Sequence, residues 1–153
     1  MFSKEETNQI RTKFWTAFGQ YMKLHLSSED EAINWINYKT GIKDLYFKTD
    51  VTNKFAILKI EMNSKDLGLQ SLMYDQFEEF QDMFQSYFEQ EWIWFREQYD
   101  DSGRIFCSIE LKLEGVSLFR ENDWPTIITF LKTNLIQLDE FWNDVKDSFE
   151  IFK

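Results

Sequence analysis

Two carboxylates and a lysine are the residues of this chain whose types and spacing could do chemistry. Glu61 lies near the end of an alternating apolar–polar segment, and Lys59, two positions earlier, falls on the same face of a strand there. Asp44 begins another alternating segment earlier in the chain. Two carboxylates on adjacent strands can hold one Mg²⁺ ion, and a lysine beside them can steady an attacking water or the charge that develops on a phosphate. The simpler interpretation is an ordinary carboxylate–lysine pair on the surface.

Strands are needed to bring these side chains together, and alternation predicts three of them. They span residues 33–38, 44–49 and 55–62, with Gly41 in the first turn because glycine accepts a positive φ without strain. The third segment is apolar on both faces at its beginning, which indicates a central strand. The first carboxylate would then begin the second strand, and the other would lie near the end of the third.

Capping signals and apolar periodicity predict three helices and a hairpin. Ser3 opens a capping box before the first helix, Asp66 can cap the second, and Pro125 lies in the first turn of the third. The predicted elements are helices at 4–25, 67–89 and 124–149 and strands at 91–98 and 104–114. The order α-β-β-β-α-β-β-α predicts one α+β domain over residues 1–153, with a mainly antiparallel sheet of about five strands covered by helices.

A helix, three antiparallel strands, a helix and a further strand are also the order of the PD-(D/E)-x-K nuclease core, which this part of the chain resembles. The resemblance implies Asp44 and Glu61 as Mg²⁺ ligands, with Lys59 in place of the lysine that the family carries after its second carboxylate. Gln70 and Tyr74 resemble the Q-x-x-x-Y pattern of some members. Asn63 stands where the family has its lysine, so the resemblance favours a degenerate relative over an active enzyme.

The stretch WINYKTGIKDLYFKTD, residues 35–50, interleaves aromatic residues with lysines. Aromatic rings stack on bases and lysines neutralise phosphates, so the stretch could contact nucleic acid. It could equally be a half-buried hairpin whose lysines and tyrosine form a surface for another protein. The candidate contact residues are Lys39, Lys43, Tyr46 and Lys48.

The charge of the chain is uneven and disfavours a general nucleic-acid binder. Residues 1–74 hold ten Lys and Arg against nine Asp and Glu, a net of +1, whereas residues 75–153 hold seven against eighteen, a net of −11. An acidic half repels a phosphate backbone and favours basic partners. A protein partner is therefore expected, and nucleic acid stays an open alternative through the lysines of residues 35–65 alone.

Composition excludes several classes of site. One Cys and one His leave no intrachain disulfide, no cysteine-based zinc cluster and no histidine pair for a metal. The glycine-rich phosphate-binding loops are absent, so no cofactor is expected, and Mg²⁺ enters only with the nuclease hypothesis. No apolar run approaches the ~20 residues of a membrane span. The N-terminus has no apolar signal core, which predicts a cytoplasmic protein.

The last predicted helix carries a narrow apolar seam that has two interpretations. From Ile128 to Phe149 the apolar residues step alternately by three and four positions, as they do in a coiled coil. The simpler interpretation lays this helix, residues 124–149, on the sheet. The alternative makes the seam the interface of a homodimer.

Five segments carry a resemblance that covers nearly the whole chain. They are KFWTAFGQYM (13–22), INWINYKTGIKDLYF (33–47), LEGV (113–116), DWPTII (123–128) and LDEFW (138–142). Together they resemble an uncharacterised bacterial family, domain of unknown function four-two-six-eight. The resemblance implies no catalytic residues, and relatives look to occur alone or at the C-terminal end of longer proteins with nuclease-like regions. We therefore expect a non-catalytic module for interaction or assembly, with a degenerate or weakly Mg²⁺-dependent nuclease as the alternative.

Overall fold

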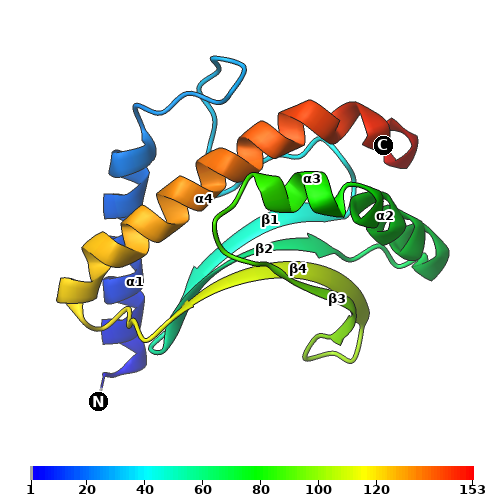
Figure 1. The fold of residues 1–153 in the computed structure, drawn as a ribbon. Coiled ribbons are helices and arrows are strands. Elements are labelled where there is room, and N and C mark those ends of the chain that lie inside the picture. The colour runs from blue at the N-terminus through cyan, green and yellow to red at the C-terminus, as the bar shows by residue number, and fades with distance from the viewer. Residues whose placement is uncertain (1) are drawn as a thin grey trace.

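The computed structural model describes residues 2–153 and contains one antiparallel sheet with helices packed on it (Figure 1). Its elements, in chain order, are α1 (Lys4–Met22), β1 (Leu45–Val51), β2 (Phe55–Met62), α2 (Leu67–Glu79), α3 (Gln81–Ser86), β3 (Ile93–Tyr99), β4 (Ile105–Glu114), η1 (Glu121–Asp123), α4 (Trp124–Val145) and η2 (Lys146–Phe152). The class is α+β, as the sequence predicts.

The sheet has the strand order β1-β2-β4-β3, and every neighbouring pair is antiparallel. β2 is central, which confirms the interpretation of its two-sided apolar beginning. Helices α2, α3 and α4 lie on one side of the arched sheet (Figure 1). The alternate residues of each strand point to the other side, which we call the open face. Its members include Tyr46, Lys48, Asp50, Phe55, Ile57, Lys59, Glu61, Ile93, Phe95, Phe106, Ser108, Glu110, Lys112 and Glu114.

The prediction of a strand at residues 33–38 is wrong, and the sheet has four strands instead of five. The segment is irregular because local hydrogen bonds replace those of a strand. The side-chain oxygen of Asn34 accepts from the backbone N–H groups of Ile36 and Asn37, at 3.1 and 3.0 Å. Such side-chain bonds compete with strand pairing. The order expected of the nuclease core therefore lacks its first strand.

The long helix predicted at residues 67–89 is also wrong, because the chain breaks at Phe80 into α2 and α3. Phe80 has φ −98° and ψ 10°, outside the helical region, and its N–H bonds to the carbonyl of Phe77. The break re-aims the chain so that Phe77 and Phe84, on the two helices, are both fully buried.

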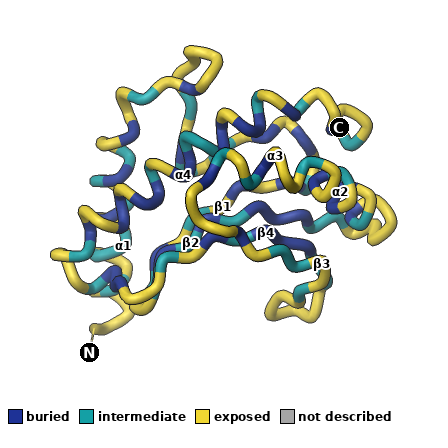
Figure 2. The backbone as a smooth tube through the Cα atoms, in the orientation of Figure 1, coloured by how far each residue is buried: buried dark blue, intermediate teal, exposed yellow. Residues whose placement is uncertain are grey.

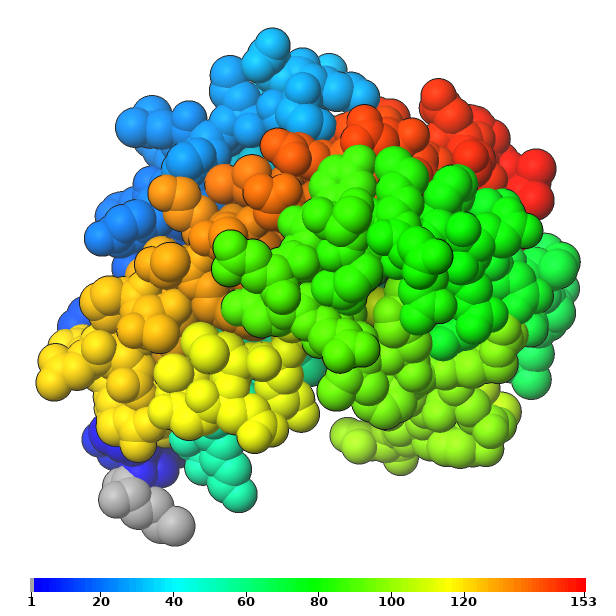
Figure 3. Space-filling view, viewed as in Figure 1, coloured from blue at the N-terminus to red at the C-terminus, as the bar shows by residue number. Residues whose placement is uncertain are grey.

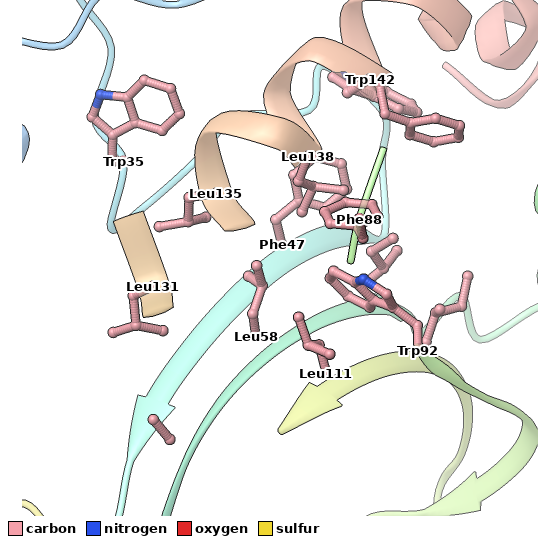
Figure 4. Close-up of a cluster of buried hydrophobic side chains, with 14 of the residues drawn as sticks. Trp35, Phe47, Leu58, Phe88, Trp92, Leu111, Leu131, Leu135, Leu138 and Trp142 are labelled. Atoms are coloured by element: carbon pink, nitrogen blue, oxygen red, sulfur yellow. The ribbon is translucent and has the colours of Figure 1, made fainter. Parts of the chain in front are cut away.

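Helix α4 covers the sheet, as the simpler interpretation of its seam predicts. Figure 4 shows Leu131, Leu135 and Leu138 projecting from α4 toward side chains of the strands. Every seam residue is buried within this one chain: Ile128, Leu131, Leu135, Leu138, Trp142, Val145 and Phe149. The buried segments of Figure 2 concentrate where α4 and the strands face each other. The seam residues thus contribute to the core of this chain.

The segment between α1 and β1 is fastened to α4 by a buried carboxylate. Asp139 accepts a hydrogen bond from the Tyr38 hydroxyl at 2.5 Å and one from the Ser28 backbone N–H at 2.7 Å. Burial, together with the neighbouring Asp139 carboxylate, raises the pKa of Tyr38. The indole of Trp35 adds a bond to the carbonyl of His25 at 3.0 Å. These contacts hold a chain segment that has no strand or helix of its own.

The edge strand β1 is capped at both ends. The Arg11 guanidinium on α1 donates to the carbonyl oxygen of Val51 at 3.1 Å. The Thr40 hydroxyl donates to the carbonyl oxygen of Leu45 at 3.0 Å. The first and last carbonyl groups of this edge are therefore already hydrogen-bonded inside the molecule.

Across residues 2–153, the helices are all too short or too polar to cross a lipid bilayer.

We expect Tyr38→Phe to lower the free energy of unfolding by about 1–3 kcal/mol, because the buried Asp139 carboxylate loses a hydrogen bond. Urea denaturation followed by tryptophan fluorescence measures the change. Tyr21→Phe is the matched control, since Tyr21 is 63% exposed and should stay within about 0.5 kcal/mol of the wild type. Equal stability of the two variants would contradict the anchoring role of the Tyr38–Asp139 contact.

Candidate groove at the sheet end

A groove of about 1270 Å³ lies where the start of β1, the end of β2 and the β3–β4 turn meet the first turn of α2. The strand ends, the turn and the residue that caps α2 contribute charged side chains. The charged residues that line the groove are Lys43, Asp44, Lys48, Lys59, Glu61, Lys65, Asp66, Asp100, Asp101 and Arg104. The other side of the sheet is covered by the side chains of α2, α3 and α4, which lie against one another (Figure 3).

Glu61 is the centre of the charge network in this groove. Its Oε2 accepts from the Lys48 ammonium at 2.6 Å and from the Asn63 amide at 2.9 Å. Lys59 lies 3.5 Å from the other carboxylate oxygen. Antiparallel pairing sets Lys48 directly opposite Lys59, a like-charge pair that is unfavourable by itself. The carboxylate offsets that repulsion, so Glu61 stabilises the sheet end.

The electrostatics of Glu61 follow from this network. Only 8% of the residue is exposed, and its burial favours the neutral acid. The hydrogen bond and charge of Lys48, the charge of Lys59 and the Asn63 amide outweigh burial and lower the pKa of Glu61 below its usual range. The carboxylate is therefore charged at neutral pH and already paired.

Asp44 reaches the same groove through an unusual backbone conformation. It has φ +62°, in the left-handed region that Asp tolerates better than most residues. Its carbonyl oxygen accepts from the Asn63 N–H at 3.0 Å, which extends the β1–β2 pairing by one step. Gly41, where a positive φ is predicted, has φ +80°. The chain thus turns twice before β1 and delivers Asp44 to the groove wall.

The groove residues fit a divalent metal poorly. Both oxygens of Glu61 face ammonium groups of lysine, which a metal would have to displace. Within the described part of the chain, no three Asp, Glu, His or Cys side chains gather closely enough to hold a metal ion. Mg²⁺ asks for several oxygen ligands in regular octahedral geometry. The arrangement suits ion pairing and hydrogen bonding with a ligand better than metal-assisted hydrolysis.

Gln70 and Tyr74 do not line the groove, although sequence reasoning grouped them with Asp44 and Glu61. The Gln70 amide donates to the carbonyl oxygens of Ser64 and Ile105, both at 3.0 Å, and so ties α2 to β4. Tyr74 is buried against Trp94, and the Arg96 guanidinium lies 4.4 Å from its ring centre. Both side chains hold α2 on the sheet.

The four predicted contact residues separate in space. Lys43 and Lys48 line the groove, and Tyr46 lies directly opposite Glu61 on the open face, with the Lys48 ammonium 5.3 Å from its ring centre. Lys39 lies instead in a smaller groove of about 360 Å³ beside α4. Three of the four predicted contact residues therefore lie in or beside the groove, and Lys39 lies elsewhere.

Arg104 of the groove was missed by sequence reasoning, and Lys65 entered only as one of the lysines of residues 35–65. Lys65 follows the end of β2, and Arg104 comes at the end of the β3–β4 turn. Their only sequence signal is position, since both lie beside turns at the same end of the sheet. Recognising this requires the pairing of β2 with β4, which joins segments distant in the chain.

Comparison with known proteins gives a match to a protein family. The model of a family described as "Domain of unknown function (DUF4268)" matches residues 10–146. No curated protein and no solved structure matches the chain.

We expect Glu61→Gln to lower the free energy of unfolding at pH 7 by about 1–2 kcal/mol, because charged hydrogen bonds are lost and Lys48 is partly exposed. It should also flatten the acid dependence. A lowered folded-state pKa gives stability that is present above the unfolded pKa and lost as pH falls through the folded value. The wild type should therefore lose more stability than the variant from about pH 5 to pH 3.

Urea titrations at pH 7, 5 and 3 measure both effects. Glu114→Gln is the control, because the exposed Glu114 has neither an ion pair nor a side-chain hydrogen bond among residues 2–153. It should keep the wild-type acid dependence. If Glu61→Gln shows that dependence too, the carboxylate does not hold the two lysines as described.

Proposed function

Because the chain belongs to the DUF4268 family, whose description names no activity, we propose a function from its own geometry: a non-catalytic protein-interaction module. The observation that carries the proposal is the state of Glu61. This buried carboxylate of the groove is held by Lys48, Lys59 and Asn63. A group bound in this way positions lysines for recognition and is not free to act as a base or a metal ligand.

The composition of the open face supports a protein partner. Each of three lysines stands over an aromatic ring: Lys48 over Tyr46, Lys59 over Phe106 and Lys112 over Phe55, at 5.3, 5.6 and 4.3 Å from the ring centres. Protein interfaces are enriched in aromatic residues, and lysine stems can cover apolar surface while their charge stays in water. The face thus combines apolar contact area with charge.

Acidic residues on the same face favour protein over nucleic acid. Glu110 lies opposite Lys59, and Glu114 lies opposite Phe55. Carboxylates at these positions repel phosphates, as does the net charge of −10. The same net charge favours encounter with a protein that is basic as a whole.

A photo-crosslinking amino acid locates the contact surface. With p-benzoylphenylalanine at Tyr46, we expect a discrete covalent adduct in the native cells, because this ring is exposed on the open face beside the groove. The control places the same group at Thr133, which is exposed on α4 on the opposite side of the sheet. Gel shift and mass spectrometry read the result. Adducts from Thr133 alone, or from neither site, would contradict the proposal.

The second candidate is a PD-(D/E)-x-K-type nuclease, degenerate or weakly Mg²⁺-dependent. The observation that favours it is that Asp44, Lys59 and Glu61 line one groove, as this hypothesis requires. For catalysis, Glu61 would have to exchange its lysine contacts for a metal ion. The interaction module needs no such rearrangement, and we rank it first.

We expect no cleavage of single- or double-stranded DNA or RNA by the purified protein with Mg²⁺ or Mn²⁺, because the carboxylate at the groove centre is already neutralised. Gel electrophoresis after long incubation measures cleavage. Asp44→Asn and Glu61→Gln distinguish a contaminating nuclease from the protein itself. Metal-dependent cleavage that both variants abolish would replace the interaction module by the nuclease.

A further inference from the structure

The groove is locally richer in positive charge than the chain as a whole. The chain has 17 basic and 27 acidic residues, whereas the groove is lined by five of each kind. The five basic residues are Lys43, Lys48, Lys59, Lys65 and Arg104. A balance this different from the rest of the molecule marks the groove as a place where negative charge can approach.

Most acidic groups of the groove are already used. Glu61 binds its two lysines, and Asp66 accepts from the Leu69 N–H at the start of α2, at 3.1 Å. Asp100 accepts from the N–H groups of Ser102 and Arg104 in the β3–β4 turn, at 2.8 and 2.9 Å. These carboxylates are engaged with lysines or backbone N–H groups inside the fold.

Three cations of the groove are not used in this way. Lys43, Lys65 and the Arg104 guanidinium form no ion pair with any group of residues 2–153. They come from three different parts of the groove rim: the approach to β1, the end of β2 and the β3–β4 turn. Cations spread along a rim in this way can pair with several carboxylates of one extended ligand.

An apolar wall lies beside these cations. Leu67 and Leu69, in the first turn of α2, are 52% and 47% exposed, and both line the groove. Met73, Phe106 and Phe152 complete the wall. Exposed apolar side chains gathered next to charge are typical of binding sites.

We infer that this groove binds an extended polypeptide segment of the partner that carries both carboxylate and bulky apolar side chains. The carboxylates pair with Lys43, Lys65 and Arg104, and the apolar side chains lie on Leu67 and Leu69. The inference rests on the proposed interaction function and names the chemistry of its partner. A partner that is basic as a whole can carry such a segment. At physiological salt charges interact only over about 8 Å, so affinity for the groove depends on the charges of the segment and not on the net charge of the partner.

A polypeptide fits this groove better than a nucleic acid does. Asp44 and Asp101 line it without an ion pair within residues 2–153, and each would repel a phosphate backbone. Peptides can place a carboxylate beside a cation and a neutral residue beside an acid, whereas a nucleic-acid strand carries one charge at every step. The apolar wall likewise matches side chains of leucine or phenylalanine.

The test uses fluorescein-labelled peptides about ten residues long. At about 3.3 Å per residue, an extended peptide of this length can contact several residues of the groove at once. The probe mixes Glu with Leu and Phe. Its three comparison peptides replace Glu by Gln, Glu by Lys, or Leu and Phe by Ser. Fluorescence anisotropy with the whole protein measures affinity. We expect the probe to bind, each comparison peptide to bind less tightly, and added salt to weaken the probe.

Variants of the groove have matched controls elsewhere on the surface. Lys65→Glu and Arg104→Glu should each weaken the probe about tenfold, equivalent to about 1.4 kcal/mol. Lys54→Glu, in the exposed β1–β2 turn, should leave affinity unchanged. Leu69→Ser should also weaken binding, whereas Leu24→Ser should not, since Leu24 is 90% exposed and lies outside the groove. Unfolding curves confirm that each variant is folded.

The outcomes separate this inference from the proposed function. The inference is supported if binding requires both the acidic and the apolar residues of the probe and is weakened only by the groove variants. Equal binding of all peptides, equal losses in the control variants, or preferred binding of a single-stranded oligonucleotide overturns it. If no peptide binds while Tyr46 still forms its adduct in cells, the inference fails and the interaction function stands.

Discussion

The contact between α4 and the sheet is the constraint on which the rest of the structure depends. Twelve residues of this helix are buried, and Trp142 alone packs against Phe47 of β1, Phe77 of α2 and Phe149 of η2. One helix thus joins three separate elements into a single core. Because that core takes one side of the sheet, the charged residues of β1, β2 and β4 face the other side, whereas Arg96 of β3 pairs with Asp75 and Glu78 of α2. The groove and its lysines are a consequence of this one-sided packing.

Sequence periodicity predicted the elements whose packing partners are near in the chain. It failed where a contact with a distant residue determines the local structure. The alternation of residues 33–38 is real, but Trp35 and Tyr38 satisfy it by packing toward His25 and Asp139, not by pairing with a strand. Likewise the apolar stripe of residues 67–89 continues through the break at Phe80, since Phe77 before it and Phe84 after it are both buried. Side-chain burial leaves the same pattern in an irregular segment and in a strand.

The candidate site was predictable in part, for a related reason. Lys59 and Glu61 follow from strand alternation, and counting back through the β1–β2 turn would have set Lys48 opposite Lys59. Arg104 could not be placed, because β4 joins β2 only after two helices and another strand have intervened. Gln70 was misassigned since its amide serves two backbone carbonyl groups, a role that no local pattern announces. Spacing in the sequence indicates which residues share a face of a strand or helix. The tertiary structure determines which residues from other segments lie beside them.

The capped edge of β1 limits how this molecule can associate. An unprotected edge strand is a template for strand addition, both by peptide ligands and by the ladders of aggregates. Here Arg11 and Thr40 already donate to the carbonyl groups at its two ends, so an added strand would have to displace these bonds or pair with the middle of β1 alone. Under the proposed interaction function, recognition beside β1 would therefore rest on side chains. Selectivity would then depend on the sequence of the partner, which main-chain pairing would largely ignore.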